Sequence, residues 1–518
     1  MKSFLKQNKG ISLVALIITI IVMMILAGVT MANMIIDNGI IEKAIKVKDE
    51  TQKNEMLEKI KTEYFALKRN EENKEKSNKE IFEILKEKLN LSAEFIGSES
   101  MIIEIIEDEY ITLLEDGTII EGKKLSLNIE DGNIDLKEKG FIQNNGELIE
   151  YAGDYIISGT TTEYCVRIWE EGIYNITIKD LNIDLSEKQI CAFNANRGFK
   201  PTGCFVTLNM EGENRLLGRP ALGFAKATPN INGEKNGSTL AIQGTGSLYA
   251  KSGNHTAAIG SGYSGADAAA GDVANIIINS GNITAIASEY GNGIGGGRGK
   301  NVNNIIINGG NIVASSLKNS GIGASSGGIL NNLVINGGNI EATGGEYGAA
   351  IGGSSGSGEV LITGGIINLK KETDFSRNYS ALGEACKGIK INGGAINIYS
   401  KLGMGIGSNN TLPFKLDMQG GKVNINDKIC STPVNLQNGV FYLAKFKIGE
   451  LAKETKITKV ETNNNVEYEA NELHTTRDGH LFMLLPQGEV TVSVTANNVT
   501  YIGTVTVTPE NTEIFKLN

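Results

Sequence analysis

The carboxylates and cations near the glycine-rich middle of this chain are the groups whose chemistry is easiest to define. A lyase that acts on acidic sugars needs a Ca²⁺ cluster to acidify the proton beside a uronate, and an arginine or lysine to take that proton. The candidates are Asp267, Asp272, Arg298, Lys300, Asp374, Arg377 and Glu384. They do not form the Asp-rich cluster that such a site needs, so solvated loop charges explain them better and we expect no catalytic residues. Asp267, Asp272 and Asp374 remain candidate Ca²⁺ ligands.

Tyrosine is the second residue type that suggests a site. An exposed tyrosine ring can stack on a sugar, and its hydroxyl adds a polar group at the ring edge. Five tyrosines in or beside the glycine-rich segments are candidate carbohydrate contacts: Tyr249, Tyr263, Tyr290, Tyr347 and Tyr379. Tyr399 lies in a similar place, and some of these rings are expected only to pack a corner.

Composition excludes several other classes of function. The chain has 518 residues and a net charge of −10, which argues against a nucleic-acid partner. The three histidines lie in separate regions, so neither a catalytic dyad nor a histidine metal site is indicated. The five cysteines lack a Cys-x-x-Cys spacing and are expected to be buried thiols, with a Cys191–Cys204 disulfide as the alternative; they are Cys165, Cys191, Cys204, Cys386 and Cys430.

A glycine-centred repeat must position these groups. Its last glycines are at 281, 310, 338, 365, 394 and 421, so the steps are 29, 28, 27, 29 and 27 residues. An Ile-Gly or Leu-Gly pair recurs in phase, at 259–260, 294–295, 322–323, 351–352, 382–383 and 406–407. Two motifs with one period indicate stacked structural units.

Each unit contains short runs rich in β-branched residues, separated by Gly, Asn and Ser, and no helical period survives across it. The fold class is therefore mainly β, and we expect a right-handed parallel β-helix over residues 150–431. Isoleucines 278, 307, 335, 362 and 391 should form an interior ladder. The asparagines that follow them should stack at a corner, and Thr363 should interrupt that row.

The segment Gly153-Asp154-Tyr155-Ile156-Ile157-Ser158-Gly159, together with this strand pattern, resembles carbohydrate-binding β-helix proteins of anaerobic Gram-positive bacteria. The resemblance implies a polysaccharide ligand. Parallel β-helices also include polysaccharide lyases and hydrolases, so the fold alone does not choose between binding and catalysis.

The N-terminus is predicted to be a membrane anchor. Residues 1–10 are a short basic leader, and residues 11–33 form an uncharged run long enough to cross a bilayer as a helix. The basic flank is expected to stay in the cytoplasm, which places the bulk of the chain outside the cell. A plain signal anchor would have the same effect.

The sequence from Lys9 to Leu16 resembles the start of type IV prepilins and pseudopilins. In that family a prepilin peptidase cuts after the glycine, here between Gly10 and Ile11, and the new N-terminus is methylated. The family usually has Glu at the fifth mature position, where this chain has Ala15, and that Glu helps a subunit to enter a filament.

The remaining segments frame the repeat. Residues 34–123 are expected to form a helical stalk and a small pilin-like α+β head, with a helix at 81–89 and strands at 101–106 and 110–114. Residues 124–149 should be a linker and cap. Residues 432–518 contain several strand-like runs and should form an immunoglobulin-like or transthyretin-like β-sandwich that covers the end of the coil.

Taken together, the sequence predicts a single-pass membrane protein with an extracellular β-helix that binds polysaccharide or acts as an adhesin on a host or cell-wall surface, without catalysis. No cofactor is required, although Ca²⁺ is possible. A β-helix lyase or glycoside hydrolase is the first alternative, which a cleft holding carboxylates and a cation would favour. A structural minor pilin or pseudopilin is the second.

Overall fold

The computed structural model describes residues 40–518 except 97–99, 107–108, 115–116, 118, 123, 152, 196–203, 225–237, 264–270, 354–357, 372–378, 402, 408–412, 427–428, 435, 437, 465, 469, 471 and 511. The chain divides into two units, Met1–Lys124 and Leu125–Asn518. The expected leader, the Gly10–Ile11 cleavage point and the apolar segment 11–33 lie outside the described residues. Among the helices that are described, none is both long enough and apolar enough to span a bilayer.

The first unit packs two helices on a small antiparallel sheet. Helix α2 (Ile40–Arg69) is followed by the short η1 (Glu71–Asn73) and by α3 (Asn78–Leu89). The sheet has the order β1 (Ser92–Ile96), β2 (Ser100–Ile106), β3 (Glu109–Leu114) and β4 (Ile119–Glu121). The expected helix and both expected strands are present.

Local chemistry explains where α3 begins. Ser77 and Glu80 form a capping box, in which each side chain accepts from the other residue's backbone N–H. The helices then close the core of the unit by packing Tyr64 against Phe82, with ring centroids 5.6 Å apart.

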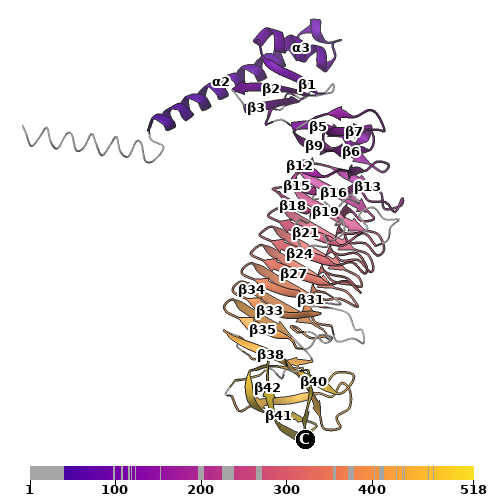
Figure 1. Cartoon of the computed structure of the whole chain (residues 1–518), viewed down its shortest axis with the longest axis vertical. Helices are drawn as coiled ribbons and strands as arrows, with labels where there is room; N and C mark the ends of the chain where they lie inside the picture. The colour runs from indigo at the N-terminus through magenta and orange to yellow at the C-terminus, as the bar shows by residue number, and fades with distance from the viewer. Residues whose placement is uncertain are drawn as a thin grey trace, which may run out of the picture. The chain divides into compact units, whose positions relative to one another are not determined.

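Three long sheets build the second unit, and one turn of the chain adds one strand to each (Figure 1). Sheet 1 contains β5 (Lys124–Asn128), β9 (Asp154–Ser158), β12 (Gly172–Lys179), β15 (Cys204–Glu211), β18 (Thr239–Gly244), β21 (Val273–Ile278), β24 (Val302–Ile307), β27 (Leu330–Ile335), β30 (Gly358–Ile362), β33 (Cys386–Ile391) and β35 (Lys415–Met418).

Sheet 2 follows the glycine corner of each turn. It contains β10 (Thr160–Thr161), β13 (Asn182–Asp184), β16 (Glu213–Gly218), β19 (Ser247–Ser252), β22 (Asn282–Ala287), β25 (Asn311–Ser316), β28 (Asn339–Gly344), β31 (Ile366–Lys371), β34 (Ala395–Ser400) and β36 (Lys422–Asn426).

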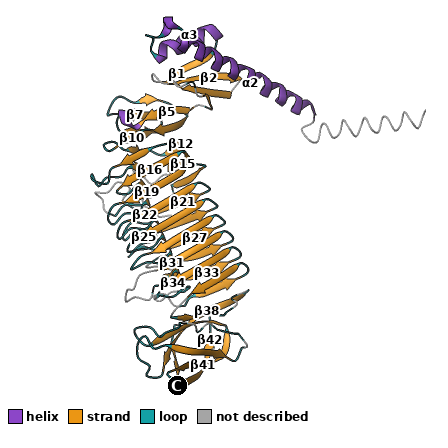
Figure 2. Ribbon diagram, turned by 180° about the vertical axis from the view of Figure 1, so that it is seen from behind, coloured by secondary structure: helices purple, strands orange, loops and turns teal. Residues whose placement is uncertain are grey.

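Sheet 3 is made largely of the Ile-Gly pairs. It contains β6 (Ile134–Lys137), β11 (Val166–Ile168), β14 (Phe193–Asn194), β17 (Leu222–Gly223), β20 (Ile259–Gly260), β23 (Ile294–Gly295), β26 (Ile322–Gly323), β29 (Ile351–Gly352) and β32 (Leu382–Glu384). Successive strands in all three sheets pair in parallel along the coil, as in a parallel β-helix (Figure 2).

The interior ladder of isoleucines is confirmed. In sheet 1, Ile278 pairs with Ile307, Ile307 with Ile335, Ile335 with Ile362 and Ile362 with Ile391. All five are fully buried. Each contributes about 1.5–3 kcal/mol by leaving water, which makes this column a main source of the coil's stability.

The corner row of asparagines is also present. The Asn308 amide donates to Asn279 and the Asn336 amide donates to Asn308, both at 2.8 Å. The expectation that Thr363 interrupts the row is wrong on this side, because its hydroxyl lies 2.9 Å from Asn336 Oδ1 and donates to it. A hydroxyl is a donor of the right reach, so it replaces an amide here.

The glycine two residues after each corner asparagine is required by its conformation. Gly310 has φ +95°, and a Cβ there would lie 2.8 Å from the backbone oxygen of Gly281. Only glycine meets both conditions, because other residues rarely adopt this φ and have no space for a side chain.

Additional strands adjoin both ends of the coil. The segment expected as linker and cap contains β5 and β6 of the long sheets, and β7 (Gly140–Gln143) and β8 (Ile149–Glu150) pair antiparallel after β6. At the other end, β38 (Gly439–Ile448) pairs antiparallel with β35 and so covers the last strand of sheet 1.

The C-terminal residues extend sheet 1 and add one separate three-stranded sheet, and side chains of both form a shared apolar core. Strands β37 (Cys430–Ser431), β40 (His480–Pro486) and β43 (Ile514–Leu517) join β38, while β39 (Ile457–Thr462), β41 (Gly488–Ala496) and β42 (Val499–Val507) form the separate sheet. All five cysteines of the chain are buried and none forms a disulfide, so Cys191 and Cys204 are not joined.

Candidate functional site

Three of the predicted tyrosines converge on one side of the coil. Tyr290 stacks on His255 with centroids 5.1 Å apart and an interplanar angle of 8°, and Tyr347 lies parallel to Tyr290 at 6.4 Å. Tyr263 packs against His255, with ring centroids 5.2 Å apart. We call His255, Tyr263, Tyr290 and Tyr347 the aromatic ladder.

Two cations flank the ladder. The Arg298 guanidinium lies 5.0 Å from the Tyr290 ring centroid and 5.9 Å from that of Tyr263. The Lys318 ammonium lies 4.7 Å from the Tyr290 centroid, and its Nζ donates to the Tyr290 hydroxyl at 3.3 Å. Such cation–π contacts orient both partners, so the charges are held beside the rings.

The ladder presents ring edges more than ring faces. Because His255, Tyr290 and Tyr347 are nearly parallel and in contact, much of their face area is covered by one another. Tyr263 is the most open ring, with 39% of its surface exposed. A ligand would therefore meet phenol hydroxyls, a guanidinium and an ammonium, with ring stacking possible at Tyr263.

The repeat explains why these groups meet. The connection from sheet 2 to sheet 3 supplies one of them in each of four successive turns, after β19, β22, β25 and β28 respectively: His255, Tyr290, Lys318 and Tyr347. Arg298 comes from the next connection, and its backbone N–H donates to His255 O at 2.9 Å. Residues spaced by one period thus form a row along the axis.

Two inward-facing side chains at the end of sheet 2 strands hold these connections. The Ser316 hydroxyl contacts the carbonyl oxygens of Glu289 and Gly291, at 3.2 and 2.7 Å, on both sides of Tyr290. One such contact restrains the residue before the ring and the other the residue after it. Ser316 is therefore a positioning residue for Tyr290.

Lys371 does the same for the connection that carries Tyr347. Its side chain is buried, with 3% exposed, and its ammonium donates to the carbonyl oxygens of Gly345, Glu346 and Gly348, the last two at 3.3 and 3.0 Å. These three carbonyls surround Tyr347 in the chain. Burial lowers the pKa of Lys371 to about 8, while the Glu384 and Glu346 carboxylates favour its charged form.

Local hydrogen bonds also shift the pKa values of two groups of the site. The hydrogen bond to the Tyr290 hydroxyl raises the pKa of Lys318, so this ammonium keeps its charge. The hydrogen bond with the Glu346 carboxylate raises the pKa of the Tyr347 phenol, which stays protonated as a donor.

The other two tyrosine candidates lie elsewhere. Tyr249 is on β19 in sheet 2, where the Arg215 guanidinium lies 5.3 Å from its ring centroid. Tyr379 is buried, with 5% exposed, and packs near the Lys371 ammonium. Its ring is therefore not available to a ligand, and the expectation that it contacts carbohydrate is wrong. Nothing in the sequence period distinguished it from the ladder tyrosines.

Of the three expected Ca²⁺ ligands, Asp272 is the one that lies within the described residues. Asp272 accepts from the backbone N–H and the side-chain amide of Asn301, at 2.8 and 3.1 Å, and so fixes a connection between turns. Asp267 and Asp374 lie outside the described residues. Within the described ranges, no three His, Cys, Asp or Glu side chains are grouped closely enough to hold a metal ion.

Among the described lyase candidates, Asp272 lies beside the connection that carries Arg298 and Lys300, and Glu384 lies on a later turn. Arg298 flanks the ladder, and Lys300 lies two residues further along the same connection. The Glu384 carboxylate is fully buried and accepts from Ser380 N at 2.8 Å. Arg377 lies outside the described residues.

Sequence reasoning missed His255, Lys318, Ser316 and Lys371. A signal for the first two existed, because both occupy the connection after a sheet 2 strand, where Tyr290 and Tyr347 lie in other turns.

Comparisons of this chain with protein-family models, with curated proteins and with solved structures give no match.

Proposed function

We propose that this chain binds polysaccharide through the aromatic ladder and its two cations. The observation that supports this is the convergence of Tyr263, Tyr290 and Tyr347 with Arg298 in one row along the coil. A polymer lying along the axis meets a new polar or aromatic group at each strand spacing, about 4.8 Å. Repeated weak contacts of this kind suit a long ligand better than a small molecule.

The groups of the ladder suit binding more than turnover. Hydroxyl, guanidinium and ammonium groups hydrogen-bond to sugar hydroxyls and carboxylates without changing protonation. Cleavage of a glycosidic bond needs a paired acid and base, whereas the carboxylate of Glu346 beside the ladder is held in a hydrogen bond with the Tyr347 phenol.

The rest of the proposal concerns location and finer fold. The uncharged segment 11–33 and the resemblance at residues 9–16 support a single-pass anchor in the cell membrane, with prepilin-type processing between Gly10 and Ile11. The basic leader supports an extracellular position for the repeat. We propose in addition a right-handed coil and a C-terminal sandwich of immunoglobulin-like or transthyretin-like type.

The test is binding and turnover measured together on the full chain, with polygalacturonate, cellulose and peptidoglycan, each with and without Ca²⁺. We expect retention on at least one polymer without new reducing ends or unsaturated products. Tyr290→Ala should weaken retention about fivefold or more, since truncating a central contact costs more than about 1 kcal/mol.

Tyr249→Ala is the matched control, because this tyrosine also lies beside an arginine but outside the ladder. Equal binding by the wild type and Tyr290→Ala would refute the ladder as the site. Release of product would instead favour the lyase alternative, and no retention on any polymer would favour the structural pilin-like role.

A further inference from the structure

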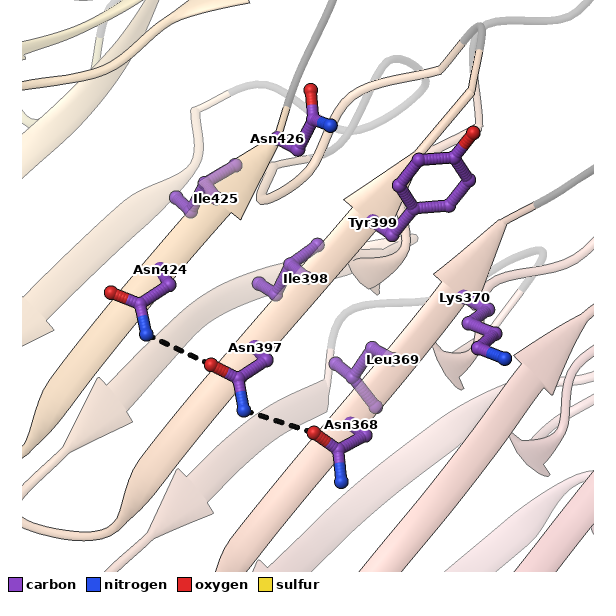
Figure 3. A pocket seen from close by; sticks show the side chains of 9 residues that line it. All are labelled: Asn368, Leu369, Lys370, Asn397, Ile398, Tyr399, Asn424, Ile425 and Asn426. Carbon is purple, nitrogen blue, oxygen red and sulfur yellow. Dashed lines mark hydrogen bonds between the residues drawn. The ribbon is translucent and has the colours of Figure 1, made fainter.

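A groove crosses the last three strands of sheet 2, on turns that follow the aromatic ladder (Figure 3). Strands β31, β34 and β36 are adjacent and parallel, and each contributes two outward side chains with the intervening residue as floor. The cavity has a volume of about 300 Å³. Strand spacing makes it about 10 Å long, and the rise between alternate residues makes it about 6.6 Å wide.

One wall of the groove is a row of amides. The Asn397 amide donates to Asn368 Oδ1 at 2.9 Å, and the Asn424 amide donates to Asn397 Oδ1 at 2.8 Å. A primary amide has two N–H donors and two acceptor lone pairs, so each keeps capacity beyond this row. The internal bonds fix the amide orientation and leave donors and acceptors at a regular spacing.

The opposite wall consists of Lys370, Tyr399 and Asn426, all exposed. The Tyr399 ring has 42% of its surface exposed and stands in the middle of the three. Among the described residues that line the groove there is no carboxylate, and Lys370 is the one charged side chain. At one end of the groove no further strand of sheet 2 follows, because β36 is the last in its order.

We propose that this groove is a second glycan-binding site, separate from the ladder, which takes about two rings of a neutral polysaccharide. The Tyr399 ring offers an apolar surface to the C–H face of a pyranose. The amide row, about 6.6 Å away, offers donors and acceptors to the hydroxyls on the ring edge.

The ligand class follows from the composition of the walls. Neutral amides pair with hydroxyls without desolvating a charge, whereas the ladder places a guanidinium and an ammonium beside its rings. The groove therefore favours uncharged sugars more than the ladder does. This inference rests on the proposed function of polysaccharide binding, and adds a site with a different preference.

The test is calorimetric titration of the full chain with cellotetraose, mannotetraose, chitotetraose and tetragalacturonate. Tyr399→Ala should weaken binding of the best neutral tetrasaccharide about tenfold, and Asn397→Leu about fivefold, because each removes one wall contact. Tyr399→Phe keeps the ring and should bind as the wild type does. Asn311→Leu is the matched control, since its amide donates to Asn282 at 2.8 Å on the same sheet but outside the groove.

The outcomes separate the groove from the ladder. Loss of neutral binding in Tyr399→Ala and Asn397→Leu, with Tyr290→Ala unaffected, supports the second site. Unchanged neutral binding in both groove variants overturns it, as does a wild-type chain that binds no neutral tetrasaccharide. If polymer retention is lost only in Tyr290→Ala, the proposed function is supported and the groove is overturned as a second binding site.

Discussion

Replacing Lys371 by methionine tests whether a buried cation holds the loop that carries Tyr347. Methionine has a similar unbranched stem, so it fills the space of the lysine without its three donors. The carbonyls of Gly345, Glu346 and Gly348 would each lose the ammonium as a partner.

The magnitude follows from two opposing terms. Loss of a buried donor costs about 1–3 kcal/mol per acceptor, so three carbonyls at about 2 kcal/mol each give about 6 kcal/mol. Against this, the variant no longer buries an ammonium whose pKa is lowered from 10.5 to about 8. That shift corresponds to about 3 kcal/mol. The expected net loss in the free energy of unfolding is therefore about 2–3 kcal/mol.

The assay combines urea unfolding with amide hydrogen exchange on the full chain. In the variant, exchange should accelerate at the Tyr347 amide, which donates to Lys318 O at 2.6 Å, before global unfolding occurs. Lys370→Met is the matched control, because this neighbouring lysine points outward and its loss should change stability by less than about 0.5 kcal/mol. Equal stability in the two variants, with unchanged protection at Tyr347, would refute the anchoring role.

Three further predictions concern pH, a corner and the thiols. Between about pH 8 and 10.5 the unfolded chain keeps a proton on Lys371 that the folded chain has released. The unfolding free energy of the wild type, measured by urea titration relative to Lys371→Met, should therefore rise with pH by up to about 3 kcal/mol. A fall would contradict the lowered pKa. Gly310→Ala should lower the free energy of unfolding by about 2–3 kcal/mol, because the φ of Gly310 is +95° and a backbone oxygen lies 2.8 Å from the new Cβ. Gly299 has open space around it, so Gly299→Ala should lose less stability in the same titration. Burial raises the pKa of Cys204 and Cys386 to about 12. Mass spectrometry should therefore find both thiols unmodified by iodoacetamide at pH 8 until urea unfolds the chain. Rapid alkylation of the folded chain would contradict this burial.

The regular part of the coil could be predicted because one physical constraint repeats in every turn. A buried isoleucine must stack on a buried residue of similar size, so Ile278, Ile307 and Ile335 recur at the period itself. Glycine at a left-handed corner leaves an equally strong trace, as at Gly310 and Gly338. Such positions tolerate few alternatives, and the sequence therefore shows them directly.

The site could be predicted only in part, because its residues depart from the repeat. Tyrosines in the connections suggested a ligand surface, and Tyr263, Tyr290 and Tyr347 do meet. The same reasoning failed for Tyr379, because a ring in a connection can turn inward or outward and no local pattern decides between them. For the groove, Tyr399 gave the same kind of signal, but the amide row beside it was not recognised, because asparagines on a strand do not show in the sequence which way their side chains point.

Lys371 shows how a departure from the repeat can be interpreted once the register is known. The equivalent inward positions in neighbouring strands hold small or hydroxyl side chains, including Ser316, which contacts carbonyls of the Tyr290 connection. A serine reaches two carbonyls, whereas the lysine reaches three at a cost of burying a charge. Packing alone would favour a small residue there, because a buried ammonium is penalised by about 3 kcal/mol. The three contacts to the carbonyl oxygens outweigh that penalty, so Lys371 both stabilises the turn and holds the loop that carries Tyr347.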